Sequence, residues 1–239
     1  MIDLIRAEII RFRSVRSTLV VLFGAIAITV LFAVLEAHDL ASAPRTVHLG
    51  EVNAGASLSA FLFGALGVQV IGQEYRFNTI RSTFAATPNR PKVVAAKLLV
   101  VTVACALAAL VMMVLAGAVG TLLVDRFAID GLDLRVVGGT VLFAAGWSAM
   151  GLGVGAIVRQ PIAGILILLG EGFVGEQILR GVFEGTGPWL PFLNGVQMMT
   201  RDRPEDLHLR SVLGGGAYFF AVAAVVLAVG IVLVERRDA

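Results

Sequence analysis

Six long apolar segments dominate the hydrophobic pattern of this chain, and short polar stretches separate them. A transmembrane helix needs about 20 largely apolar residues to cross a hydrocarbon core of roughly 30 Å, and unbroken apolar runs lack the alternation of β-barrel strands. The pattern therefore predicts an all-α membrane protein with six transmembrane helices. The predicted spans are residues 17–35, 54–72, 98–124, 136–158, 162–175 and 212–234.

The fifth predicted span is the shortest and contains Glu171, so we expect it either to re-enter the membrane or to continue into the next stretch. Residues 176–192 have apolar positions at helical spacing and then two prolines, which predicts short re-entrant helices in the outer leaflet. The loop at residues 36–53 contains mixed charge and a proline. We expect that loop to be exposed to solvent.

Ahead of the first span, Ile2, Ile5, Ile9 and Phe12 recur at helical spacing among charged residues. This pattern predicts an amphipathic helix over residues 1–16 that lies in the membrane interface. The alternative is a short basic flank that only fixes the orientation of the chain.

A polar, turn-rich segment at residues 74–90 separates the second and third spans. Phe77, Ile80 and Phe84 lie at helical spacing, which gives a short helix one apolar face. Pro88 and Pro91 break that helix, and Pro91 can also begin the next one as its first residue. The segment is therefore predicted to be a short helix and a tight corner that leads directly into the third span.

Composition supports a single membrane domain, since 58% of the 239 residues are hydrophobic, 15% are charged and the mean hydropathy is +0.90. Basic residues gather on one side of the predicted membrane and are fewer on the other, which places both termini in the cytoplasm. They are topology signals, and we expect no nucleic-acid partner because no contiguous soluble basic surface is predicted. The basic residues assigned to the inner side are Arg6, Arg11, Arg13, Arg16, Arg76, Arg81, Arg90, Lys92, Lys97, Arg159, Arg236 and Arg237.

Catalytic and cofactor motifs are missing from the sequence. The stretch from Gly170 to Gly175 fits G-x-G-x-x-G, but it lies in a predicted span without a βαβ unit, so the glycines favour close helix packing or a break in the span. Gly151 and Gly155 form a comparable small-residue pair in the fourth span. Neither lysine follows the glycine of a P-loop, so the chain is not expected to hydrolyse nucleotides or to act as an enzyme.

Metal and disulfide chemistry are also disfavoured. Cys105 is the single cysteine, which excludes an internal disulfide or a cysteine metal cluster. His38, His48 and His208 fall in predicted outer loops without metal-ligand spacing, and we expect them to be solvated.

Three polar side chains could line a substrate path through the membrane. Glu171 is a carboxylate inside an apolar run; it could contact a cationic substrate, pair with Arg180, or simply face the outer headgroups. Gln69 and Gln73 lie four residues apart on the second span and could line a polar path or bond to a neighbouring helix.

Several short motifs give the chain a resemblance to a known family. They are Arg13-Ser14-Val15-Arg16-Ser17-Thr18, Glu74-Tyr75-Arg76, Thr79-Ile80-Arg81, Thr87-Pro88-Asn89-Arg90, Lys97 at the third span, and the terminal Arg236-Arg237-Asp238-Ala239. In order and spacing they resemble the permease subunits of type-2 ABC exporters, especially those of actinobacteria. The resemblance covers nearly the whole chain.

The resemblance implies a six-helix half-transporter in the bacterial cytoplasmic membrane, with an N-terminal elbow helix, a coupling helix and re-entrant helices. Its implied partners are a second permease subunit, identical or homologous, and two copies of an ATPase subunit that carries the ATP and magnesium, while membrane lipid surrounds the spans. The implied function is outward movement of a drug-like, peptide or lipidic substrate. The alternative is an ion-coupled transporter or channel without an ATPase. The implied ATPase contacts are Glu74, Tyr75, Arg76, Phe77, Thr79, Ile80, Arg81, Phe84, Pro88 and Arg90.

Overall fold

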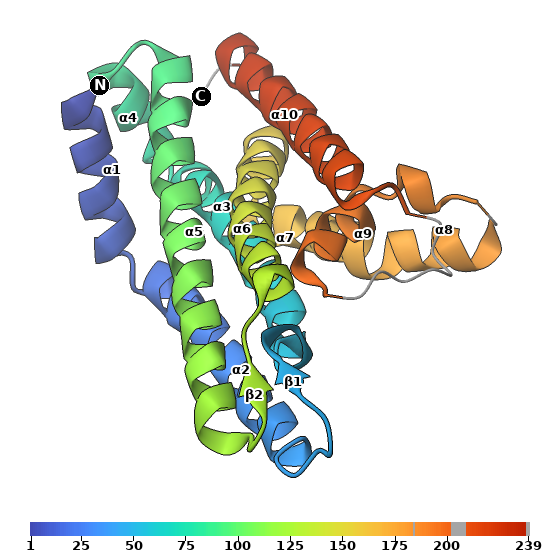
Figure 1. Ribbon diagram of the computed structural model, residues 1–239. Coiled ribbons are helices and arrows are strands. Elements are labelled where there is room, and N and C mark those ends of the chain that lie inside the picture. The colour runs from blue at the N-terminus through green and yellow to red at the C-terminus, as the bar shows by residue number, and fades with distance from the viewer. Residues whose placement is uncertain (184, 202–208, 238–239) are drawn as a thin grey trace.

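The computed structural model describes residues 1–183, 185–201 and 209–237, and its architecture is helical throughout, with a minimal sheet (Figure 1). The prediction of an all-α membrane protein is confirmed, because six helices are long and apolar enough to cross a membrane. These helices are α2 (Arg16–Asp39), α3 (Ala54–Arg76), α5 (Arg90–Leu123), α6 (Gly131–Val158), α7 with its continuation through α8 (Pro161–Val182), and α10 (Val212–Arg236).

The two ends of the molecule carry different elements (Figure 1). One end holds α1 (Ile2–Ser14), the short helix α4 (Ile80–Ala86) and the end of α10, and we call it the termini side. The opposite end holds β1 (Val47–His48) and β2 (Phe127–Ala128), and we call it the strand side. The chain thus begins and finishes its helical part at the same end, as an even number of crossings requires.

Helices α3 and α6 form the centre of the bundle, where close backbone approach depends on glycine. A Cβ atom on Gly151 would collide with the backbone of Gly64, and one on Gly155 would crowd the backbone of Val68. The predicted small-residue pair is therefore a packing surface, as small residues commonly are between membrane helices. Beside it, Trp147 and Phe143 are fully buried, with their ring centroids 5.9 Å apart.

Capping extends two helices beyond their predicted spans. Helix α5 begins at Arg90, because the Asn89 side chain accepts a hydrogen bond from the Lys92 backbone at 3.1 Å and Pro91 fits the first turn. Helix α6 begins at Gly131, where the Asp130 carboxylate accepts hydrogen bonds from the backbone N–H groups of Leu132 and Asp133. The corner and restart predicted before the third span are confirmed. The 34 residues of α5 rise roughly 50 Å at 1.5 Å each, so α5 is longer than the hydrocarbon core is thick.

The fifth span differs from its predicted end at residue 175. Its helical backbone passes from α7 (Pro161–Leu169) through the π-helical segment η2 (Gly170–Gly175) into α8 (Glu176–Val182). The glycine motif thus changes the winding of the helix without ending it. Residues 176–182 therefore continue the span, and only the later short elements return to the bundle, where they pack against α6 and α10. These elements are η3 (Gly187–Trp189), α9 (Pro191–Val196) and η4 (Gln197–Met199).

The expectation of a solvent-exposed loop at residues 36–53 is wrong for its second part: residues 38, 39, 42 and 44–46 are exposed, whereas none of residues 47–53 is. Helix α2 continues to Asp39, and β1 then pairs in parallel with β2, with Val47 opposite Phe127. The side chains of Val47, Leu49 and Val52 are buried. Leu49 is the first residue of the short helix η1 (Leu49–Glu51), and Val52 is its C-cap. Pairing with the distant β2 segment explains the burial, because it folds this loop against the ends of α5 and α6.

Candidate functional site

A cluster of four charged side chains, three of them buried and one, Arg11, partly exposed, joins three helices at the termini side. Lys97 of α5 is fully buried, and its Nζ lies 2.9 Å from Glu8 Oε2 on α1 and 2.5 Å from Glu74 Oε1 on α3. Arg11 of α1 pairs with Glu74 as well, and its Nη1 lies 3.3 Å from Glu8 Oε1. We call Glu8, Arg11, Glu74 and Lys97 the buried ion-pair cluster. Two carboxylates face two cations, so the cluster is electrically balanced.

The cluster also reaches the coupling segment through Thr83. Arg11 Nη2 donates to Thr83 Oγ1 at 3.4 Å, and that hydroxyl donates to Glu74 Oε2 at 3.4 Å. Since Thr83 lies on α4, these contacts connect α1, α3, α4 and α5. Removing one member of a buried ion pair typically costs about 3–5 kcal/mol, because its partner stays buried without compensation. The four elements are thus held together by interactions that are costly to break.

Sequence reasoning missed three members of this cluster. Glu8 is the buried residue of α1, whereas Ile2, assigned to its apolar stripe, is 82% exposed. The helix at residues 1–16 is confirmed, but the face it turns inward is polar at its centre. Lys97 was assigned as an inner-side charge and as part of the family resemblance, with no structural role. A signal was present, because Lys97 lies among apolar residues in the first turns of a membrane helix, where an unpaired charge is costly.

The implied ATPase contacts fall into an exposed and a buried set. The backbone turns between α3 and α4 with Asn78 in the left-handed region at φ 56°, and Phe77 there is 65% exposed. We call residues 76–79 the α3–α4 turn. The exposed members of the implied set are Arg76, Phe77, Thr79, Arg81 and Pro88. Phe77 therefore does not belong to the apolar face of the short helix, which consists of the buried Ile80 and Phe84.

The remaining implied contacts hold the segment to its neighbours. Glu74 is 4% exposed and belongs to the buried ion-pair cluster. The expectation that Glu74 contacts another protein directly is therefore wrong. The guanidinium of Arg159 lies 4.8 Å from the ring centre of Tyr75. Arg90 Nη1 donates to the backbone oxygen of Val234 at 2.9 Å, which ties the start of α5 to the last turn of α10.

A cavity of about 730 Å³ lies beside the cluster. Its lining comes from α1, α2, α3, α5 and α7 and includes Gln69 and Gln73. Gln73 Nε2 donates to Ser17 Oγ of α2 at 3.1 Å and to Gln69 Oε1 at 3.3 Å. Gln73 thus bonds to a neighbouring helix, as one of the two interpretations expects, and both glutamines line a hollow; a substrate path along them stays a prediction.

Glu171 does not lie in this cavity. It is half-buried in η2, and its side chain interacts with that of Glu176. Glu176 is buried, and its Oε1 and Oε2 accept hydrogen bonds from the backbone N–H groups of Phe192 and Leu193 at 2.7 and 2.8 Å. Glu176 therefore caps the N-terminus of α9 and holds the short returning helix against the fifth span. Sequence reasoning placed Glu176 at the start of the predicted re-entrant helices and assigned it no role.

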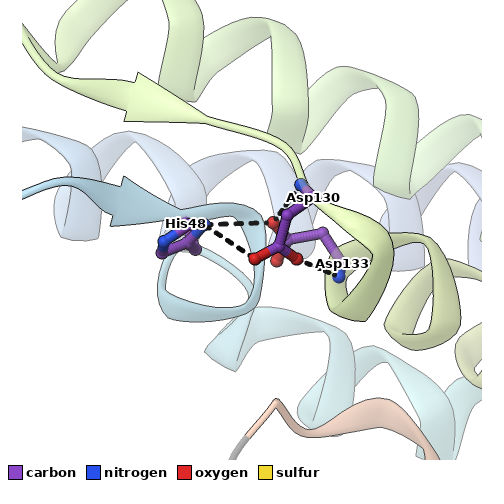
Figure 2. Close-up of side chains that lie close together, drawn as sticks. All are labelled: His48, Asp130 and Asp133. Carbon is purple, nitrogen blue, oxygen red and sulfur yellow. Dashed lines mark hydrogen bonds and ion pairs between the residues drawn. The ribbon is translucent and has the colours of Figure 1, made fainter.

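A second charged cluster lies at the strand side (Figure 2). His48 Nδ1 lies 3.3 Å from Asp133 Oδ2 and 3.7 Å from Asp130 Oδ2, and the Asp133 side chain is fully buried. The Arg201 guanidinium lies 2.6 Å from Asp130 and 3.0 Å from Asp133. We call His48, Asp130, Asp133 and Arg201 the strand-side cluster. Of the three histidines expected to be solvated, His38 is exposed, whereas the expectation for His48 is wrong. His208 lies outside the described residues.

Electrostatics in the strand-side cluster favour the ionised carboxylates. Hydrogen bonding to the Arg201 guanidinium holds the pKa of Asp130 well below its usual range, and the same bond raises the pKa of Arg201. The nitrogen and oxygen atoms of His48, Asp130 and Asp133 lie within 4.8 Å of one another, a spacing that could hold a cation. Arg201 already supplies that positive charge, so a metal ion would have to displace it.

No protein-family model matches the chain, and no curated protein matches it. Its fold defines a helical, multi-pass membrane protein with six candidate spans. Within the described residues, the termini side combines an exposed turn, a buried ion-pair cluster and a cavity, and we take this region as the candidate functional site.

Proposed function

We propose that this chain is the membrane-spanning permease subunit of an ABC export system. A separate ATPase subunit hydrolyses ATP, and this chain moves a drug-like, peptide or lipidic substrate outward together with a second permease subunit. The termini side then faces the cytoplasm of a bacterial cell. The observation that carries the proposal is the exposed α3–α4 turn with the buried ion-pair cluster directly behind it.

The chemistry of the turn suits a protein partner. Phe77 is 65% exposed, and the guanidinium of Arg76 lies 5.5 Å from its ring centre. Aromatic and arginine side chains contribute much of the binding energy at protein interfaces. Because the sequence contains no P-loop, an ATP-driven transporter needs its ATPase on another chain. The turn offers that subunit an aromatic anchor beside a positive charge.

The buried ion-pair cluster connects the α3–α4 turn to the membrane helices, so that a movement of the turn is transmitted to them. Glu74 lies in the last turn of α3, two residues before Arg76, and pairs with Lys97 on α5 and Arg11 on α1. A force on the turn therefore acts on three helices at once instead of bending one loop. In this proposal Glu74 transmits movement, and the exposed turn makes the contact.

Alanine at Phe77 tests the contact without disturbing the core. The full chain is purified from its native membrane in mild detergent, and the ATP-binding subunit that accompanies it is quantified by mass spectrometry. We expect near-equal amounts with the wild-type chain and at least tenfold less with Phe77→Ala, since interface anchors are typically worth 2 kcal/mol or more. Phe23→Ala is the matched control, because Phe23 is 63% exposed but lies on α2, away from the turn.

Two results would contradict the proposal. One is that no ATP-binding subunit accompanies the wild-type chain. The other is that Phe77→Ala and Phe23→Ala retain the ATPase equally well. Transport into ATP-free vesicles driven by an ion gradient alone would instead favour the ion-coupled transporter. The interaction of Glu171 with Glu176 in a candidate span is the observation on which that alternative depends.

A further inference from the structure

The cavity at the termini side has an excess of positive charge on largely apolar walls. Among its charged lining residues, Glu8, Arg11 and Glu74 belong to the buried ion-pair cluster, which is neutral once Lys97 is included. The lining also contains Arg16 and Arg76, which are exposed and lie within hydrogen-bond reach of no carboxylate in the described part of the chain. The two guanidiniums therefore give the cavity an uncompensated charge of two.

The rest of the lining is suited to a hydrocarbon chain. Val70, Val100 and Ile165 contribute to the walls, and Ile162 is 61% exposed, so the apolar wall continues onto the outer surface of α7. A volume of about 730 Å³ lies within the range of roughly 300–1,000 Å³ that is typical of small-molecule sites. The basic residues lie where the elbow helix α1 passes into α2, next to the end of α3.

We propose that this cavity binds an anionic phospholipid from the adjoining leaflet. The phosphate contacts Arg16 and Arg76, and part of one acyl chain lies along Val70, Val100 and Ile165. Guanidinium groups bind phosphate through paired, charge-assisted hydrogen bonds. A phospholipid matches both the charge and the apolar walls, whereas a free phosphate matches only the charge. Lipid binding here does not depend on the proposed export function.

Native mass spectrometry of the detergent-purified full chain tests this assignment. The chain is titrated separately with phosphatidylglycerol, phosphatidylcholine of the same acyl chains, and glycerol 3-phosphate. We expect preferential binding of phosphatidylglycerol and about a tenfold loss of its affinity in Arg16→Gln, because a charge-assisted hydrogen bond contributes about that factor. The matched control is Arg13→Gln, which removes another exposed arginine that does not line the cavity.

A second variant addresses the apolar wall. Ile165→Trp fills part of the cavity and should weaken phosphatidylglycerol binding, with an unchanged elution volume and melting temperature as evidence that the chain still folds. The proposal is overturned if both arginine variants lose affinity equally, because binding would then follow general surface charge. It is also overturned if phosphatidylcholine binds as well as phosphatidylglycerol, or if glycerol 3-phosphate binds as tightly as the whole lipid.

Discussion

The two charged clusters at opposite ends of the molecule use their ion pairs differently. The buried ion-pair cluster joins α1, α3 and α5 through side chains alone, with Lys97 fully buried beside a cavity. In the strand-side cluster the carboxylates also accept backbone hydrogen bonds; Asp133 Oδ1, for example, accepts from the Gly50 N–H at 3.1 Å. The first arrangement joins separate helices through their side chains, whereas the second also ties loops and a helix cap together through backbone groups.

This difference has a structural consequence for movement. A cluster made of side chains on separate helices can rearrange by changing rotamers, and the adjacent cavity leaves room for that change. A cluster that includes backbone donors and a helix cap can change only if the backbone itself unfolds locally. Under the proposed function, the termini side is the moving end and the strand side is the fixed end.

The largest expected effect comes from Lys97→Met. This variant leaves Glu8 and Glu74 buried without their main cation and should lower the free energy of unfolding by about 3–5 kcal/mol. Lys92→Met is the matched control, because Lys92 is exposed and its change should stay within about 0.5 kcal/mol. Denaturant unfolding in detergent measures both variants. Equal stability of the two would show that the buried cluster does not hold the helices together.

The next largest effect is expected from Arg201→Gln at the strand side. Asp133 keeps its backbone donors in this variant but loses the guanidinium, so we expect destabilisation by about 1.5–3 kcal/mol, as for a lost hydrogen bond to a charged group. Arg126→Gln is the control, since Arg126 is exposed and donates to the Pro44 carbonyl instead of a carboxylate. A larger loss for Arg201→Gln than for Lys97→Met would reverse the comparison between the two ends.

Acid pH should affect the strand side through Asp130. Its pKa is depressed in the folded state, so the unfolded chain binds more protons and the contribution of Asp130 to stability is lost as the pH falls below about 4. We expect the stability of the wild-type chain to fall more steeply over that range than that of Arg201→Gln, where only the backbone N–H groups of Leu132 and Asp133, and no longer the Arg201 guanidinium, favour the ionised carboxylate. Unfolding free energies measured from pH 6 to pH 3 test this. If the unfolding free energies of the wild-type chain and of Arg201→Gln depended on pH in the same way, the Asp130–Arg201 pair would have no role in this pH dependence.

The sequence was sufficient to predict that there are six spans, but it was insufficient for the end of the fifth span and for the contacts between the helices. Long apolar runs determine membrane helices directly, because each span satisfies its own backbone hydrogen bonds. The pairing of Glu8 with Lys97 depends instead on how α1 packs against α5, and no local pattern encodes that choice. The same holds for β1 and β2, which are too short to give an alternating signal. Glu176 belongs to the fifth span but caps α9, which comes later in the chain, so the pattern of its own span does not predict this role.

The smallest effect on stability is expected from Arg45→Gln, which removes a surface ion pair at the same end of the molecule as the strand-side cluster. Arg45 Nη2 lies 2.5 Å from Glu51 Oε2, but the Arg45 side chain is 57% exposed, and exposed pairs of this kind contribute about 0–1 kcal/mol. Arg45→Gln should therefore cost less than Arg201→Gln, although both remove a guanidinium from a carboxylate on the same end of the molecule. Chemical unfolding of the two variants under identical conditions measures the difference. If the costs were equal, the fixed end would depend on the number of its ion pairs, and the burial of Asp133 would not be what makes it rigid.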